Sequence, residues 1–176
     1  MRIVPVGRRR RGGVTLVEST LLLSIFLLFL FGVFEYSRLL MILHVTTNAA
    51  RSGARHATVN VDKSNTFVTA DDGTTLSIRN HVISQMGGQH TNLQGASGTA
   101  FTVTAFPCDI NGLYQNPVVI SPKVGYTSWN QATFTERIAV RVTGEFRPIL
   151  PGFVFFYTGG SDFVPIQITA AAGSEG

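Results

Sequence analysis

RRRRGGVTLVESTLLLSIFLLFLFGVF, the stretch at residues 8–34, decides the fold of this chain. Its part from Val14 to Phe34 would form a helix about 31 Å long, which matches a bilayer hydrocarbon core of about 30 Å. Residues 21–30 are Leu, Ile and Phe with a single Ser. The helix therefore lacks the polar face that a surface helix of a soluble protein shows. This pattern predicts a membrane-spanning helix over residues 14–34.

Basic residues precede the span and set its orientation. Arg2 and the run Arg8–Arg11 stand before it, and no acidic residue does. The positive-inside rule places the N-terminus in the cytoplasm and everything after Phe34 outside it. A secretory signal peptide fits poorly, because the apolar run ends without a small-x-small cleavage site. A twin-arginine export signal stays open as an alternative, supported by the arginines alone.

The net charge of the chain comes from this leading segment. The sequence has 14 Lys and Arg against 10 Asp and Glu, a formal net charge of +4. Residues 1–13 hold five arginines and no acid, so 14 − 5 = 9 basic residues remain against 10 acids, a net charge of −1. We interpret the basicity as a topology signal and expect no nucleic-acid partner.

One cysteine, Cys108, is present, which excludes a disulfide within the chain. We expect it to be buried and inert, with pairing between chains as the alternative.

The helix is predicted to continue beyond the membrane. No proline occurs from Arg8 to Thr58, so one helix over residues 14–57 is expected. A polar stripe at His44, Asn48, Arg51 and Arg55 should face solvent; Arg51 and Arg55 are either solvated charges or contacts for an acidic partner. A seam with alternating spacings of four and three residues predicts the buried face at Tyr36, Leu40, Leu43, Thr47, Ala50, Ala54 and Ala57.

The remainder, residues 58–176, is predicted to be an extracytoplasmic domain. Residues 60–75 and 89–98 are polar and indicate loops. Between them, Leu76, Ile78, Val82, Ile83 and Met86 predict a short helix that ends at Gly87-Gly88.

Alternating patterns rich in Val, Thr and Phe then predict strands. They cover residues 99–106, ending at Pro107, residues 137–143, with Ile138, Val140 and Val142 on one face, and residues 163–171. A short strand at 118–120 lies in an excursion over residues 107–130, and the aromatic run 153–157 is either core or a docking patch. The predicted fold class is α+β: a long N-terminal helix, a short helix and a small antiparallel sheet, a pilin-like layout.

This layout resembles the TadE-like pseudopilins, minor pilins of Tad/Flp-type type IV pilus systems. Three stretches carry the resemblance: RRGGVTLVE at residues 10–18, FGVFEYSR at 31–38 with NAARSGAR at 48–55, and VRVTGEFRPILP at 140–151. The first is similar to a prepilin leader with its cleavage point between Gly13 and Val14. The likeness is dense over the first 57 residues and sparse afterwards, and the excursion at 107–130 has no counterpart in it.

The resemblance implies a mechanism of processing and assembly. A prepilin peptidase would remove residues 1–13, so that Glu18 becomes the fifth residue of the mature chain. Glu18 would then meet the terminal amine of a neighbouring subunit; the alternative is that it pairs with the amine of Val14 in its own chain. The protein would be a structural or assembly-priming subunit of the filament.

Further partners implied are other pilin subunits, an inner-membrane pilus assembly platform and membrane lipid. The chain would cross the inner membrane once, with its C-terminal domain outside the cytoplasm, and enter a cell-surface pilus. Two other functions stay open: a pseudopilin of a type II secretion system, which shares the leader, and a membrane-anchored extracytoplasmic binding domain.

No residue pattern indicates catalysis. The sequence has no nucleotide-binding loop, no zinc-ligand spacing and no nucleophile motif, so we expect no enzyme activity, no metal and no cofactor. His44, His56, His81 and His90 stand in unrelated sequence contexts. His81 and His90 with Asp71 and Asp72 match no ligand spacing, and we interpret them as solvated polar residues.

Overall fold

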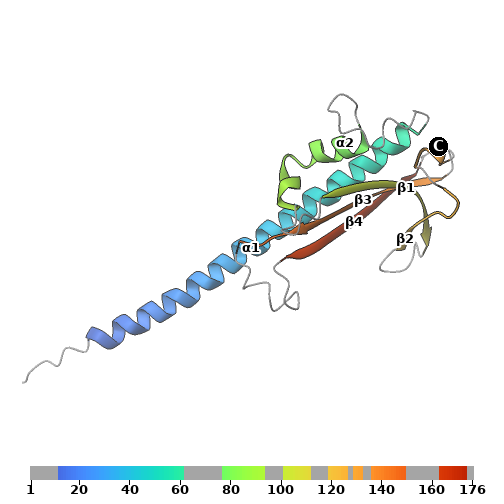
Figure 1. Cartoon of the computed structure of the whole chain (residues 1–176). Helices are drawn as coiled ribbons and strands as arrows, with labels where there is room; N and C mark the ends of the chain where they lie inside the picture. The colour runs from blue at the N-terminus through green and yellow to red at the C-terminus, as the bar shows by residue number, and fades with distance from the viewer. Residues whose placement is uncertain are drawn as a thin grey trace, which may run out of the picture. The chain divides into compact units, whose positions relative to one another are not determined.

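The computed structural model describes residues 12–61, 77–93, 101–111, 119–126, 129–132, 136–149 and 163–173. Within them, two α-helices precede four β-strands along the chain (Figure 1). The chain divides into two compact units, Met1–Ser37 and Arg38–Gly176. The predicted α+β class, with a long N-terminal helix, a short helix and a small antiparallel sheet, is confirmed.

Helix α1 (Gly12–Val59) is 48 residues long and confirms the long helix predicted for residues 14–57. At 1.5 Å per residue it extends for about 72 Å. Its residues 12–37 belong to the first unit, and its residues from Arg38 onward belong to the second. The predicted leader, residues 1–13, lies outside the described residues except for Gly12 and Gly13, which start the helix.

The sheet has four antiparallel strands in the order β2-β1-β3-β4. The central pair β1 and β3 is joined by β4 on one side and by the much shorter β2 on the other. On β3 the predicted alternation is confirmed, because Ile138, Val140 and Val142 are buried on one face. The strands are β1 (Thr102–Asn111), β2 (Val119–Pro122), β3 (Arg137–Phe146) and β4 (Val164–Gly173).

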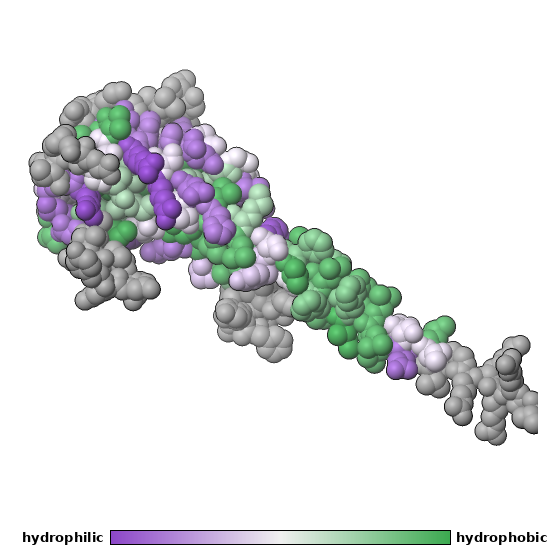
Figure 2. All heavy atoms as spheres, turned by 180° about the vertical axis from the view of Figure 1, so that it is seen from behind, coloured by the Kyte–Doolittle hydropathy of each residue, from purple (hydrophilic) through white to green (hydrophobic). Residues whose placement is uncertain are grey.

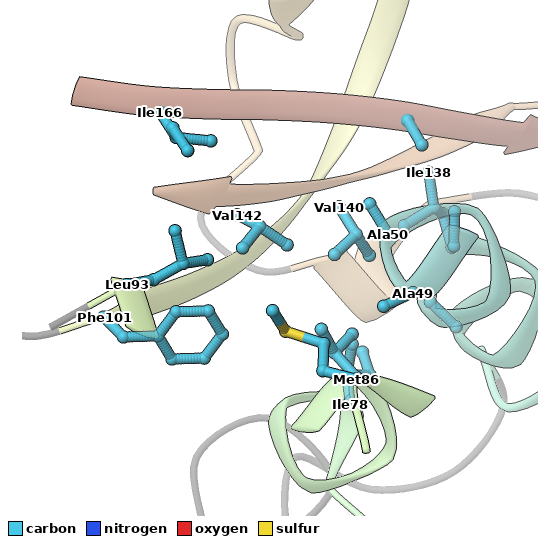
Figure 3. Packing of buried hydrophobic residues seen from close by; sticks show 14 of the residues in the cluster. Ala49, Ala50, Ile78, Met86, Leu93, Phe101, Ile138, Val140, Val142 and Ile166 are labelled. Atoms are coloured by element: carbon cyan, nitrogen blue, oxygen red, sulfur yellow. The ribbon is translucent and has the colours of Figure 1, made fainter. Parts of the chain in front are cut away.

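The core lies between the sheet and two helical segments of the second unit, the C-terminal part of α1 and helix α2 (Ile78–Gln85). Figure 3 shows β3 side chains directed toward Ala49 and Ala50 of α1, toward Ile78 of α2 and toward Met86, which directly follows α2. Small residues on α1 allow its backbone to approach the sheet closely. Gly53 marks the tightest point, since a Cβ there would lie 2.5 Å from Val82 Cγ2 and 3.5 Å from Val140 Cγ1.

The buried face of α1 differs from the predicted seam in its first half. The seam is correct from Ala50 onward, but Tyr36 is 62% exposed, and Ile42, Thr46 and Ala49 take the buried positions instead. Ile42, Thr46 and Ala49 keep the alternating spacing, but each lies one position before a residue of the predicted seam, so the buried face is turned by about 100° around the helix. Tyr36 belongs to the first unit, whereas the core lies in the second. The polar stripe at His44, Asn48, Arg51 and Arg55 is exposed, as predicted.

Helix α2 forms where the apolar spacing predicted it. Ser77 caps it, with Asn80 N–H donating to Ser77 Oγ at 3.0 Å. Gly87 and Gly88 follow with φ of +55° and +86°, backbone conformations that glycine adopts without strain. The loop predicted at residues 60–75 lies outside the described residues apart from Asn60 and Val61, which form a turn, and Leu76 lies outside them too.

The loop predicted at residues 89–98 is wrong in its first half, where Gln89–Leu93 forms a short 3-10 helix, η2. Leu93 is fully buried in the core, and this one apolar side chain anchors an otherwise polar segment. Gly144 of β3 makes room for it, because a Cβ at Gly144 would lie 2.8 Å from the Leu93 carbonyl oxygen.

The first strand does not end at Pro107, as predicted, but continues to Asn111. Lys123 N–H donates to the Pro107 carbonyl at 2.9 Å, so the backbone groups of Pro107 point toward β2 and away from β3. The missing N–H of the proline therefore falls beside Lys123, just past the end of β2, and leaves the ladder between β1 and β3 complete.

The two remaining strands were predicted within two residues of their ends. Strand β2 covers Val119–Pro122 against a prediction of 118–120, and β4 covers Val164–Gly173 against 163–171. The aromatic run at residues 153–157 lies outside the described residues.

Candidate membrane and assembly segment

The apolar half of α1 presents its side chains outward. Figure 2 shows a continuous run of apolar side chains along the helix. The helix is long and apolar enough to cross a membrane, and none of its most apolar window is buried. A single-pass membrane anchor is therefore consistent with the first unit. The large exposed side chains of the predicted span are Leu16, Val17, Leu21, Leu22, Leu23, Ile25, Phe26, Leu27, Leu28, Phe29, Leu30, Phe31, Val33 and Phe34.

Hydroxyl groups within the apolar half are satisfied by the helix itself. Ser19 Oγ donates to the Thr15 carbonyl at 2.8 Å, and Thr20 Oγ1 donates to the Leu16 carbonyl at the same distance. Ser24 Oγ donates to the Thr20 carbonyl at 2.9 Å. Each bond reaches back one turn, so these side chains need no partner from lipid or from another protein.

Glu18 differs from these hydroxyls. Its side chain is exposed, and among the described residues none forms a hydrogen bond or ion pair with it. A carboxylate at the centre of a membrane helix costs about 2.5–3.5 kcal/mol on insertion scales, and less near the edge. Such a group pairs with a cation or faces protein. Glu18 lies about 6 Å along the helix from Val14, so one turn separates it from the predicted mature N-terminus.

The second unit brings together two histidines, His56 and His81, for which the sequence analysis predicted no contact. The rings of His56 on α1 and His81 on α2 stack with centroids 4.3 Å apart and planes 7° apart. His81 Nε2 is 2.9 Å from Ser52 Oγ, which lies one turn before His56. This contact was missed because the histidines are 25 positions apart and only the packing of α2 on α1 joins them. No group of three metal-ligating side chains occurs among the described residues.

The stack makes the packing of α2 on α1 sensitive to pH. Burial lowers the pKa of His81 from its ordinary value of 6.5, and His56 lowers it further. Below pH 6.5 the unfolded chain binds a proton that the folded chain resists. The free energy of unfolding should therefore fall as the pH drops through 6.5. It should stop falling once the pH is below the pKa that His81 has in the folded protein.

We expect the urea midpoint of the purified full chain to fall between pH 7.5 and 5.5, with His81→Gln reducing this dependence. Emission from Trp129, the one tryptophan in the sequence and 1% exposed, reports the unfolding. His44→Gln, at an exposed position of α1, should keep the wild-type pH profile. Identical profiles for His81→Gln and wild type would contradict the role of His81.

The excursion at residues 107–130 is held by side chains at its base. Glu136 Oε1 accepts hydrogen bonds from Lys123 Nζ and from Tyr126 Oη, the latter at 2.7 Å. These hydrogen bonds raise the pKa of both Lys123 and Tyr126. Cys108 is buried, and burial raises the pKa of its thiol, with Arg137 opposing this shift. The thiol therefore has the environment of an inert structural cysteine, as predicted.

Comparisons with curated proteins and with solved structures gave no match. Residues 13–55 match the family model of the TadE-like proteins. The matched range begins at Gly13, includes Glu18 and the exposed apolar half of α1, and ends beside His56. The resemblance predicted from the sequence is thus confirmed over residues 13–55, which lie within helix α1 and are similar to the TadE-like proteins.

Proposed function

We propose that the protein is a minor pilin or pseudopilin, a structural or assembly-priming subunit of a Tad-type pilus filament, without enzyme activity. One observation carries the proposal: the apolar half of α1 is exposed, contains a single carboxylate near its start, and lies within the TadE-like range. A helix that served only as an anchor would have no use for Glu18 or for the Gly13-Val14 junction.

In this proposal the same helix surface is used twice. Before assembly, lipid of the inner membrane covers the apolar side chains, and the domain from Arg38 onward lies outside the cytoplasm. A prepilin peptidase then cuts after Gly13, and the assembly platform transfers the subunit into the filament. There the apolar surface packs on the helices of other pilins, and Glu18 meets the amine of a neighbour.

Cleavage by the peptidase and incorporation into the filament can both be measured. In a host with the pilus genes and the peptidase, the full-length protein should begin at Val14 and be recovered with filaments sheared from cells. Mass spectrometry of the membrane and sheared fractions measures both. Deleting the peptidase should leave residues 1–13 attached and empty the sheared fraction.

The same experiment distinguishes the two alternative functions, a membrane-anchored binding domain and a type II secretion pseudopilin. An intact N-terminus with the peptidase present would contradict the proposal and favour a membrane-anchored binding domain. Processing with no recovery in sheared filaments, but recovery with a secretion complex, would favour a type II secretion pseudopilin.

A further inference from the structure

Strand β4 forms one edge of the described sheet. It pairs with β3 alone among the described strands, and all ten of its residues are in register with β3. An edge strand of this length presents a row of backbone donors and acceptors to any strand that can reach it.

The register identifies which backbone groups of β4 face away from β3. The backbone carbonyl of Pro107 points toward β2, as its hydrogen bond from Lys123 N–H shows. The backbone groups of the even-numbered residues of β1 therefore point toward β3. On β3, the odd-numbered residues then hydrogen-bond to β1, and the even-numbered residues direct their backbone groups toward β4. Their partners on β4, Ala170 and its even-numbered neighbours, direct their backbone groups toward β3. The odd-numbered residues of β4 therefore face outward: Pro165, Gln167, Thr169, Ala171 and Gly173. The assignment agrees with Pro165, since a strand proline is found where its missing N–H faces away from the sheet.

Within the described residues, this edge carries few of the features that usually prevent strand pairing. None of the residues of β4, VPIQITAAAG, is charged, and its one proline stands at the second position. Val164, Ile168 and Ala172 point to the core side yet are only partly buried, whereas their partners on β3 are fully buried. An apolar margin therefore remains beside the edge, and an added strand would cover it.

We propose that β4 pairs antiparallel with β4 of a second copy of this chain, about a two-fold axis at Thr169. In this register Thr169 faces Thr169 of the second copy, Gln167 faces Ala171, and Pro165 faces Gly173. The edge is complementary to itself: no like charges meet, every outward N–H finds a carbonyl, and only the bond that Pro165 cannot donate is missing at each end. The inference is independent of the proposed function, because it rests on the sheet and holds for any single-pass protein with this domain.

Cysteine pairs test the register in the full chain, in membranes and in a Cys108→Ala background. Directly opposed residues of an antiparallel hydrogen-bonded pair have Cα atoms about 5.5 Å apart, within the range of about 4.4–6.8 Å that a disulfide requires. Thr169→Cys should therefore form a disulfide-linked homodimer under mild oxidation. Gln167→Cys alone should not, since its equivalents are about 13 Å apart, but co-expression with Ala171→Cys should restore the cross-link.

Thr104→Cys is the matched control, because Thr104 is exposed on the same sheet face but lies on β1, which β3 separates from β4. Adding Thr169→Lys to the Gln167→Cys and Ala171→Cys pair should reduce cross-linking at least tenfold, because two ammonium groups would then face each other. The proposal is wrong if Thr169→Cys cross-links no better than Thr104→Cys. It is also wrong if Gln167→Cys cross-links to itself, or if Thr169→Cys is captured by a different protein.

Discussion

Glu18→Gln should insert into the membrane and be cleaved after Gly13, yet be largely absent from sheared filaments. The substitution keeps the size of the side chain and removes its charge. If the carboxylate meets the amine of a neighbouring subunit in an apolar filament core, removing one partner costs about 2–5 kcal/mol. At about 1.4 kcal/mol per tenfold change, incorporation should fall on the order of 30-fold or more. Quantitative immunoblots of sheared and membrane fractions measure this ratio.

Glu35→Gln is the matched control for this experiment. Glu35 is a carboxylate on the same helix, beyond the predicted span, and it already has an interaction partner within the protein. We expect that variant to enter filaments at nearly the wild-type level. Equal incorporation of Glu18→Gln and wild type would show that Glu18 only neutralises the amine of its own chain, and the assembly role would then be rejected.

Gly53→Ala should destabilise the second unit, Arg38–Gly176, by about 1–3 kcal/mol, the usual range for an overpacked core. The new Cβ would lie 2.5 Å from Val82 Cγ2, closer than two non-bonded carbon atoms can approach. Val82 is fully buried in α2, and a valine in a helix has essentially one χ1 rotamer, so it cannot turn aside. Alanine gains up to about 1 kcal/mol over glycine in helix propensity, and we expect the clash to outweigh that gain. Urea unfolding followed by Trp129 emission gives the change in free energy.

Two further variants isolate the contact between Gly53 and Val82. Val82→Ala removes the atom that clashes, so the double variant should be more stable than the sum of the two single effects predicts. Arg55→Ala, two positions along on the exposed face of α1, should change stability by less than about 0.5 kcal/mol. A Gly53→Ala protein more stable than wild type would show that helix propensity outweighs packing here.

The sequence was most informative where one physical pattern dominated. The span at residues 14–34 and the strand around Val140 follow from hydrophobic runs and alternation, and the structure confirms a helix and a strand there. Glu18 could be identified as a candidate because a carboxylate in an apolar helix is costly wherever the helix is placed. Its role in assembly, and the cleavage at Gly13, stay predictions.

Features that depend on the neighbouring elements could not be predicted. Pro107 was assigned to a strand end, because its tolerance depends on which side of β1 its nitrogen faces, and only the sheet order decides that. Leu93 was assigned to a loop, because its burial depends on a glycine 51 positions away. The stack of His56 on His81 exists only after α2 has packed on α1.

Strands β1 and β3 are both ten residues long but pair with an offset, and this offset bears on how the domain can vary during evolution. The pairing of β1 with β3 ends at Cys108, so residues 109–111 pair with β2 alone and form a two-stranded ribbon beyond the main sheet. Residues inserted between Asn111 and Val119 would leave every β1–β3 and β3–β4 pair in place. Doubling the length of a flexible loop costs only about 0.6 kcal/mol in closure entropy. Homologous chains should therefore differ most in length at this ribbon, where new sequence can accumulate without loss of the core.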